Sequence, residues 1–217
     1  MNSFMMDIKT NSNDLHTVAE KTGFLKRLLE GKASTESYGE YLYNLYEVYK
    51  ALEANLEKNK ENKVVKNFVI PEIYRASAIH KDISYFLGER LNTIKPIAST
   101  KAYVDKINEL GETSPELLVA HAYTRYLADL FGGRTMYGIM KTLYNVDEAR
   151  LNYYKYDKLN DGPEMKNFVM NYHNTLNNIE LDDQMKEKFI NEVANSYIYN
   201  IAISNEIDFI KFGNLKN

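Results

Sequence analysis

Proline is scarce in this chain, and this scarcity limits the possible folds more than any other feature. Only four prolines and ten glycines interrupt 217 residues. Between them, apolar residues recur at spacings of three and four rather than in strict alternation. That spacing is typical of amphipathic helices. The chain is therefore expected to be all-α, and its length suffices for one domain, or barely two.

The helices can be placed from this pattern and from the residues that interrupt it. We expect helices at about 11–30, 35–58, 64–88, 98–110, 115–144, 163–178 and 181–209. Gly31 and Gly88 stand where helices are expected to end. Ser114, followed by proline and glutamate, is typical of a helix N-cap. The segment 145–162, rich in tyrosine and asparagine, has no clear helical pattern.

The composition excludes several classes of site and partner. The chain has no cysteine, which rules out disulfides, zinc–thiolate sites and cysteine nucleophiles. The only soft-metal ligands are four histidines: His16, His80, His121 and His173. A net charge of −3 argues against a nucleic-acid partner. No signal-peptide pattern and no window of roughly 18 apolar residues appears, so we expect a cytoplasmic protein without a membrane anchor.

Tyrosines are concentrated in the stretch SYGEYLYNLYEVYKALE. Tyr38, Tyr41, Tyr46 and Tyr49 fall largely on one helical stripe, and packing into a core is the common reason for such a stripe. A buried phenol, however, needs a hydrogen-bond partner. A polar cavity lined by tyrosine hydroxyls is therefore the alternative explanation.

The stretch YTRYLADLFGGRTM combines a charged pair with two glycines. Arg125 and Asp129 are four residues apart, the spacing of an ion pair on one helix face. Gly132 and Gly133 follow inside the same helix, where each glycine costs about 1 kcal/mol relative to alanine. Either tight packing between helices or the close approach of a flat, bulky ligand would explain the two glycines.

A second pair at the same spacing is His16 and Glu20. The glutamate could hold one imidazole nitrogen while the other nitrogen faces a metal. On spacing alone, a surface ion pair is the more common explanation. Motifs of other chemistries, including Glu-x-x-His, Walker A, G-x-G-x-x-G and His-Glu-x-x-His, are absent from the sequence.

Long segments of the chain resemble one known family. PELLVAHAYTRYLADLFGGR resembles the distal helix of heme oxygenases, and HTVAEKTGFLKRLLEG resembles their proximal helix. YEVYKALEANLEKNKE and IPEIYR extend the similarity, which runs from about residue 8 to 209. The resemblance implies that residues 1–217 form a single all-α heme oxygenase-like domain with flexible termini. Heme would lie between the proximal helix and a kinked distal helix.

The resemblance also implies roles for individual residues. His16 would be the axial ligand of the heme iron, and Glu20 would hydrogen-bond its ring. Asp129 would be the distal carboxylate, with Gly132 and Gly133 letting the distal helix bend over the heme. The residues implied to organise distal waters are Tyr49, Tyr103, Arg125 and Asn200. Those implied to bind the heme carboxylates are Lys9, Tyr123 and Lys166.

The activity implied is oxidative cleavage of heme b, which serves as both substrate and cofactor. It would consume O₂ and electrons from an external donor protein, such as a reductase, a ferredoxin or a flavodoxin, and would yield biliverdin, CO and Fe²⁺. Three positions depart from the family pattern: Ala128 replaces a glycine, Phe131 a small residue and Met170 an arginine. They leave open an alternative, a non-catalytic heme-binding protein for storage, transfer or sensing.

Overall fold

A computed structural model of the protein describes residues 3–159 and 162–213. Every regular element within these residues is helical, which confirms the all-α prediction. None of the helices that the structure describes is both long and apolar enough to cross a membrane. The terminal residues 1–2 and 214–217, which were expected to be flexible, lie outside the described part of the chain.

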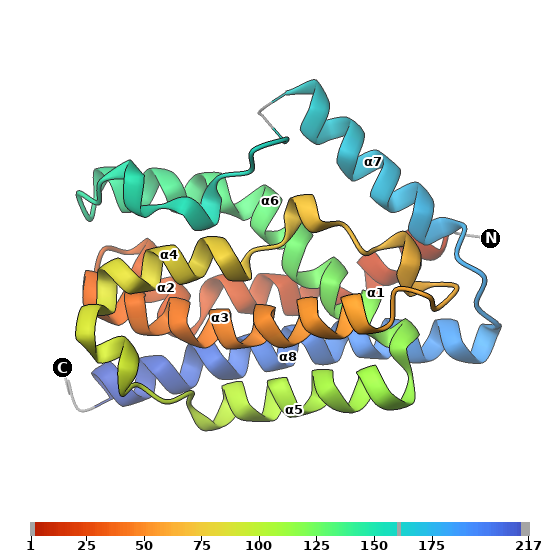
Figure 1. The fold of residues 1–217 in the computed structure, drawn as a ribbon, viewed down its shortest axis with the longest axis horizontal. Coiled ribbons are helices and arrows are strands. Elements are labelled where there is room, and N and C mark those ends of the chain that lie inside the picture. The colour runs from red at the N-terminus through yellow and green to blue at the C-terminus, as the bar shows by residue number, and fades with distance from the viewer. Residues whose placement is uncertain (1–2, 160–161, 214–217) are drawn as a thin grey trace.

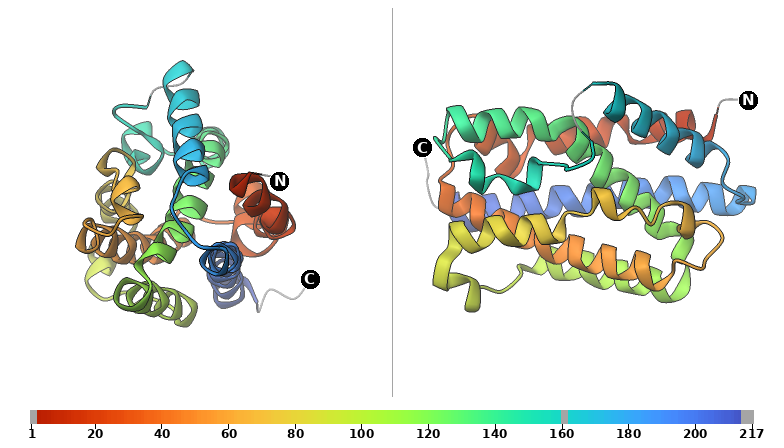
Figure 2. Two further views of the ribbon diagram at one scale, coloured as in Figure 1. Left: turned by 90° about the vertical axis from the view of Figure 1, so that its right-hand side faces the viewer. Right: turned by 45° about the horizontal axis from the view of Figure 1, so that its top comes forward.

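Eight α-helices form the architecture of this part of the chain. They are α1 (Phe4–Lys21), α2 (Gly23–Leu29), α3 (Thr35–Lys58), α4 (Ala76–Leu87), α5 (Ala98–Thr113), α6 (Leu118–Thr142), α7 (Pro163–Asn177) and α8 (Asp183–Phe212). The long helix α8 packs against α1, α2, α5 and α6, while α3 packs against α4 and α5 (Figure 1). Both views of Figure 2 show α6 crossing the bundle, and the right-hand view shows it changing direction along its length.

One hydrophobic core joins these helices, and α3 contributes much of it. Leu42, Val48 and Leu52 are fully buried on one side of α3, and burying each such side chain stabilises the fold by roughly 1.5–3 kcal/mol. Gly39 lets α4 approach closely, because a Cβ atom there would lie 2.6 Å from the Cβ of Phe86. The periodic apolar residues thus supply the buried side of α3, and Gly39 permits its close contact with α4.

The first predicted helix, 11–30, is wrong in its start and in its continuity. Helix α1 begins earlier, after Ser3, whose side chain accepts a hydrogen bond from the backbone of Met6. The chain then breaks before α2 at Gly23, which has a φ of +60°. A side chain at Gly23 would come within 2.5 Å of the Asn205 side chain. The break therefore depends on a contact with α8 that the local sequence does not contain.

The predicted helix 64–88 is also wrong in its first half. Two short 3-10 turns, Val65–Asn67 and Pro71–Ile73, replace it, and α4 begins only at Ala76. The side chain of Glu53 in α3 accepts hydrogen bonds from the backbone N–H groups of Arg75 and Ala76, at 2.6 and 3.0 Å. A carboxylate from another helix therefore fixes where α4 begins.

The predicted helix boundaries elsewhere are closer to those observed. Gly31 and Gly88 follow helix ends with φ values of +71° and +52°, as expected for glycines that end helices. The expected N-cap at Ser114 is wrong in detail, since its side chain makes no capping hydrogen bond. A 3-10 turn at Pro115–Leu117 comes first, and α6 begins at Leu118.

Candidate functional site

The centre of the candidate site is a buried ion pair on α6. Arg125 Nη2 lies 3.3 Å from Asp129 Oδ1, and the two side chains are only 9% and 11% exposed. These low exposures rule out a pair on a solvated helix face. Burial raises the pKa of Asp129 well above its usual range, and a hydrogen bond from Tyr153 opposes that rise.

Two tyrosines from other elements hold the Asp129 carboxylate. Tyr49 of α3 donates to Oδ2, and Tyr153, in the 3-10 turn Asn152–Tyr154, donates to Oδ1 at 2.6 Å. Arg125 donates to both phenol oxygens, through Nε to Tyr49 and Nη2 to Tyr153, each at 3.2 Å. Because both phenol oxygens accept from the guanidinium, their own hydrogens are directed at Asp129.

Asn200 of α8 joins this cluster, whereas Tyr103 of α5 lies one layer behind it. Asn200 Oδ1 accepts from Arg125 Nη1 at 2.7 Å. The Tyr103 hydroxyl instead contacts Ser196 Oγ at 2.8 Å and His121 Nδ1 at 3.0 Å. Burial raises the pKa of Tyr103 to about 12, so it stays protonated at neutral pH. The structure thus brings four of the five predicted distal residues into direct contact.

Sequence reasoning missed Tyr153, a member of this cluster, and His121, which lies behind it beside Tyr103. His121 is fully buried and pairs with Glu192 of α8, with Nε2 2.9 Å from Oε1. It stands four residues before Arg125 and eight before Asp129, on one helix face. That spacing is a sequence signal that could have found His121. No comparable signal exists for Tyr153, which lies in an irregular segment.

The two adjacent glycines of α6 differ in their surroundings. A Cβ atom at Gly132 would meet no protein atom within 4 Å, whereas one at Gly133 would lie 3.3 Å from Tyr154 Cδ1. Packing between helices therefore does not explain Gly132. Its missing side chain leaves an open surface one turn after Asp129.

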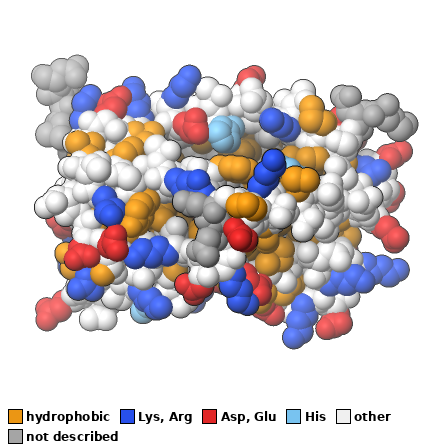
Figure 3. Space-filling model, turned by 90° about the horizontal axis from the view of Figure 1, so that it is seen from above, with side chains coloured by type: hydrophobic (Ala, Val, Ile, Leu, Met, Phe, Trp, Pro, Cys, Tyr) orange, Lys and Arg blue, Asp and Glu red, His pale blue; other side chains and the backbone are white. Residues whose placement is uncertain are grey.

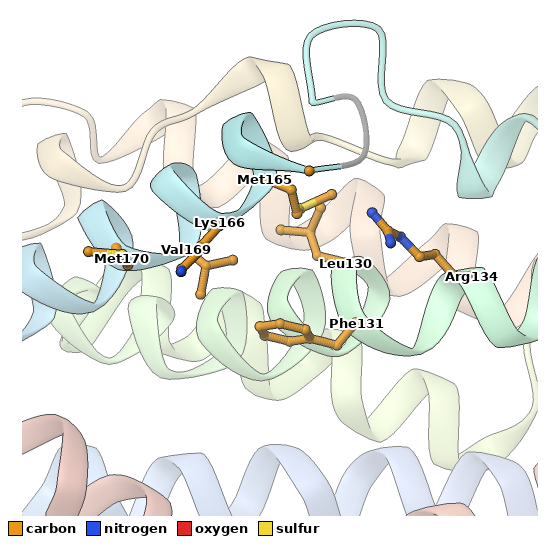
Figure 4. A pocket seen from close by; sticks show the side chains of 8 residues that line it. Leu130, Phe131, Arg134, Met165, Lys166, Val169 and Met170 are labelled. Atoms are coloured by element: carbon orange, nitrogen blue, oxygen red, sulfur yellow. The ribbon is translucent and has the colours of Figure 1, made fainter.

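A cavity of about 480 Å³ lies between α6 and α7, close to these glycines. Figure 4 shows Leu130, Phe131 and Lys166 among the side chains that face it. A second cavity, of about 340 Å³, reaches Asp129 itself. Phe131 is 62% exposed although it is aromatic. Figure 3 shows hydrophobic, basic and histidine side chains together on this face of the molecule.

The predicted proximal pair lies on α1, outside both cavities. The His16 side chain is 49% exposed, and its Nε2 lies 3.8 Å from Glu20 Oε1, an ion-pair distance rather than a hydrogen bond. The ring of His16 meets the ring of Tyr197 edge-on at 6.0 Å. Burial raises the pKa of Tyr197. The charge of Arg125 opposes this rise, and the charge of Glu20 adds to it. Tyr197 of α8 therefore contacts His16 of the α1 pair and also senses the charge of Arg125.

The three residues predicted to bind heme carboxylates come from different helices. Lys9 is exposed on α1. Burial lowers the pKa of His173 on α7, and the charge of Lys9 lowers it further. Lys166 is exposed on α7 and lines the larger cavity. Tyr123 on α6 is half-buried, and burial raises its pKa. Of these three residues, Lys166 lines the larger cavity, whereas Lys9 and Tyr123 line neither cavity.

These residues suit heme. An accessible imidazole can ligate iron, exposed apolar side chains can cover a porphyrin, and exposed lysines can pair with its carboxylates. The open surface at Gly132 leaves room for a flat ring beside the α6 backbone.

A family model described as heme oxygenase matches residues 2–206. The chain belongs to the heme oxygenase family. A heme oxygenase from Porphyra purpurea is 34% identical over 210 residues, spanning 96% of this chain and 88% of that protein. Heme oxygenase-2 from Synechocystis sp. PCC 6803, solved in complex with heme and NO, has a TM-score of 0.92 and 28% identity, covering 98% of this chain and 88% of that one. The heme oxygenase of Leptospira interrogans has a TM-score of 0.87 and 30% identity, covering 94% and 100%.

Proposed function

We propose that this heme oxygenase-family enzyme binds heme between α1 and α6 and cleaves it to biliverdin, CO and Fe²⁺. The observation that carries the proposal is the buried Asp129 cluster, placed one turn before the open backbone at Gly132. Bound heme would supply the iron centre at which O₂ reacts, and its porphyrin would be the substrate. Electrons would come from an external donor protein, and we expect the reaction to take place in the cytoplasm.

The proximal and peripheral residues would bind and orient the substrate. His16 would ligate the iron, and Glu20 would fix the direction of its imidazole ring. Lys9 and Lys166 would pair with the heme carboxylates, supported by the Tyr123 hydroxyl. Because these groups come from α1, α6 and α7, they would fix which edge of the ring lies near Asp129.

The distal cluster would control a proton. A buried carboxyl with a raised pKa can hold a proton at a higher pH than an ordinary carboxyl and then release it. Arg125 and Tyr49 hold Asp129 by direct hydrogen bonds, and Asn200 holds Arg125 in turn. The protonated carboxyl would deliver its proton from Oδ1 or Oδ2 through water, without contacting the ring directly, and would become a carboxylate.

The second candidate is a heme-binding protein without turnover. The bulkier Ala128 and Phe131 and the uncharged Met170 favour it. The network around Asp129 favours catalysis, because storage or transfer of heme requires no proton donor.

Spectroscopy of the purified protein separates the two functions. Heme is added, followed by O₂ and a reductant, and the absorption spectrum is recorded with time. Catalysis predicts loss of the heme band and formation of biliverdin. A heme band that persists unchanged would leave only the binding function.

The variant Asp129→Ala tests the role of the carboxylate in the same assay. We expect heme to bind normally and the biliverdin yield to fall about 100-fold, the lower end of what general acid–base groups contribute. An unchanged yield in this variant would contradict the role of Asp129.

A further inference from the structure

Tyr153 contacts the reactive centre although it belongs to no α-helix. Its side chain is 5% exposed, and its hydroxyl donates to Asp129 Oδ1 at 2.6 Å. Tyr49 donates to the other oxygen, Oδ2. We propose that Tyr153 is a positioning residue that fixes the orientation of the Asp129 carboxylate for proton delivery. This role rests on the function proposed above.

The contact to Oδ1 is the one that limits rotation of the carboxylate. A carboxylate held at one oxygen can still turn about its Cβ–Cγ bond, whereas one held at both oxygens cannot. On Oδ1 the alternative donor is Arg125 Nη2, at the longer distance of 3.3 Å. The 2.6 Å bond from Tyr153 has the length of a charge-assisted O–H···O⁻ hydrogen bond. Tyr153 is therefore the principal restraint on that oxygen.

The segment that carries Tyr153 is itself anchored by buried charges. Asp82 of α4 is fully buried and accepts from the backbone N–H of Asn152 at 3.0 Å and of Tyr153 at 2.8 Å. Arg75, also buried, donates to the backbone carbonyls of Tyr153 at 3.2 Å and Lys155 at 2.6 Å. The backbone around Tyr153 is thus held by side chains, and this fixes the position from which its phenol extends.

Core packing is the competing explanation for Tyr153. Its ring lies 6.1 Å from that of Tyr49 and 4.8 Å from that of Tyr154. Phenylalanine would preserve these ring contacts and remove only the hydroxyl. The substitution Tyr153→Phe therefore separates a positioning role from packing.

The protonation of Asp129 is a direct readout of this contact. The Tyr153 hydrogen bond opposes the effect of burial on the Asp129 pKa. Two other titratable groups, Arg125 of α6 and Tyr49 of α3, contact Asp129. The charge of Asp129 also acts on Tyr41 of α3, Tyr154 and Tyr156, and Arg134 and Lys155 line the same cavity. All of these remain in Tyr153→Phe, so a change in titration reports the lost hydroxyl.

A matched control is Tyr38→Phe. Tyr38 is a fully buried tyrosine whose hydroxyl donates to Tyr154 at 2.8 Å. Both variants lose one buried hydroxyl, but only Tyr153 donates to Asp129. Protein without added heme is labelled with ¹³C-aspartate, and the Asp129 carboxyl signal is assigned with Asp129→Asn. We expect the Asp129 titration to move to higher pH in Tyr153→Phe and to stay in place in Tyr38→Phe. Coincident titrations of wild type and Tyr153→Phe would overturn the proposal.

Turnover provides the second measurement. With heme bound, we expect Tyr153→Phe to consume heme about tenfold more slowly than wild type and Tyr38→Phe, an effect of roughly 1.4 kcal/mol. Heme affinity should be the same in all three proteins. Equal rates would overturn the positioning role. If wild type does not consume heme but the titration still shifts, the proposed function fails while the restraint on Asp129 stands.

Discussion

Single residues four positions apart carry much of the proposed chemistry, and burial decides what each pair does. Arg125 and Asp129 are nearly buried and share two partners from other elements, Tyr49 and Tyr153. His16 and Glu20 have the same spacing but are about half exposed. A buried carboxylate needs hydrogen bonds to remain charged, whereas an exposed imidazole is available to an incoming ligand. The same spacing therefore serves a proposed proton donor in one helix and a proposed iron ligand in the other.

At His16 this argument gives a spectroscopic prediction. The substitution His16→Ala removes the one imidazole that we propose as iron ligand, so the heme complex should lose its imidazole-type absorption spectrum. Added imidazole should restore the spectrum by occupying the space left by the side chain. A spectrum of His16→Ala identical to that of wild type would exclude His16 as the ligand.

Among the helices, α6 keeps glycine where the protein itself has no packing reason for it. Gly132 and Gly138 both face open space, since a Cβ atom at either would meet nothing within 4 Å. Each glycine destabilises a helix interior by about 1 kcal/mol relative to alanine. Only Gly132 lies one turn after Asp129, where the proposed ligand would cover the helix. Gly138 is therefore a matched control for Gly132 within the same helix.

We expect Gly132→Ala and Gly138→Ala each to raise the melting temperature of the heme-free protein by a few degrees, which corresponds to about 1 kcal/mol. Heme affinity should fall only in Gly132→Ala, by about tenfold, because the added methyl group meets the porphyrin. Thermal unfolding and heme titration of both variants measure this. Equal heme affinity in the two variants would show that Gly132 does not lie against the ligand.

In the molecule as a whole, the site exists because α8 supports elements that are distant in sequence. Helices α1 and α6 both pack on α8, and Tyr197 of α8 contacts the ring of His16 on α1. The carboxylate of Asp129 is held from α3 and from the segment after α6. Folding therefore assembles a buried acid whose protonation is linked to the stability of the entire protein.

The pH dependence of stability follows from the raised pKa of Asp129. Its ordinary value is 3.8, and burial raises the pKa in the folded state. Between these two values the folded protein binds more protons than the unfolded chain, so this contribution to stability is full below 3.8 and is lost as pH rises through the folded pKa. The free energy of unfolding of wild type, relative to Asp129→Asn, should therefore decrease as pH rises, by at most about 1.4 kcal/mol per pH unit.

Urea unfolding of heme-free wild type and Asp129→Asn, at several values from about pH 4 to about pH 8, measures this difference. If the free energies of unfolding of the two proteins change with pH in parallel, the raised pKa of Asp129 is contradicted.

The sequence predicted most of the helices because their periodicity is local. Helix α3 matches its predicted range, and Gly31 and Gly88 mark helix ends through their own backbone conformations. The predicted helices 11–30 and 64–88 were wrong where another part of the chain intervenes. Asn205 of α8 excludes a side chain at Gly23, and Glu53 of α3 sets the start of α4.

The sequence by itself determined the all-α class, the family and the residue types along α1 and α6, because spacing on a helix face is encoded within a few turns. Only the tertiary structure decided that Tyr153 contacts Asp129. That contact depends on Asp82 and Arg75, which lie more than 70 residues before the segment they hold. Hydrogen bonds from side chains to an irregular backbone produce no periodic pattern in the sequence. The contact between Tyr153 and Asp129 could therefore be identified only from the folded structure.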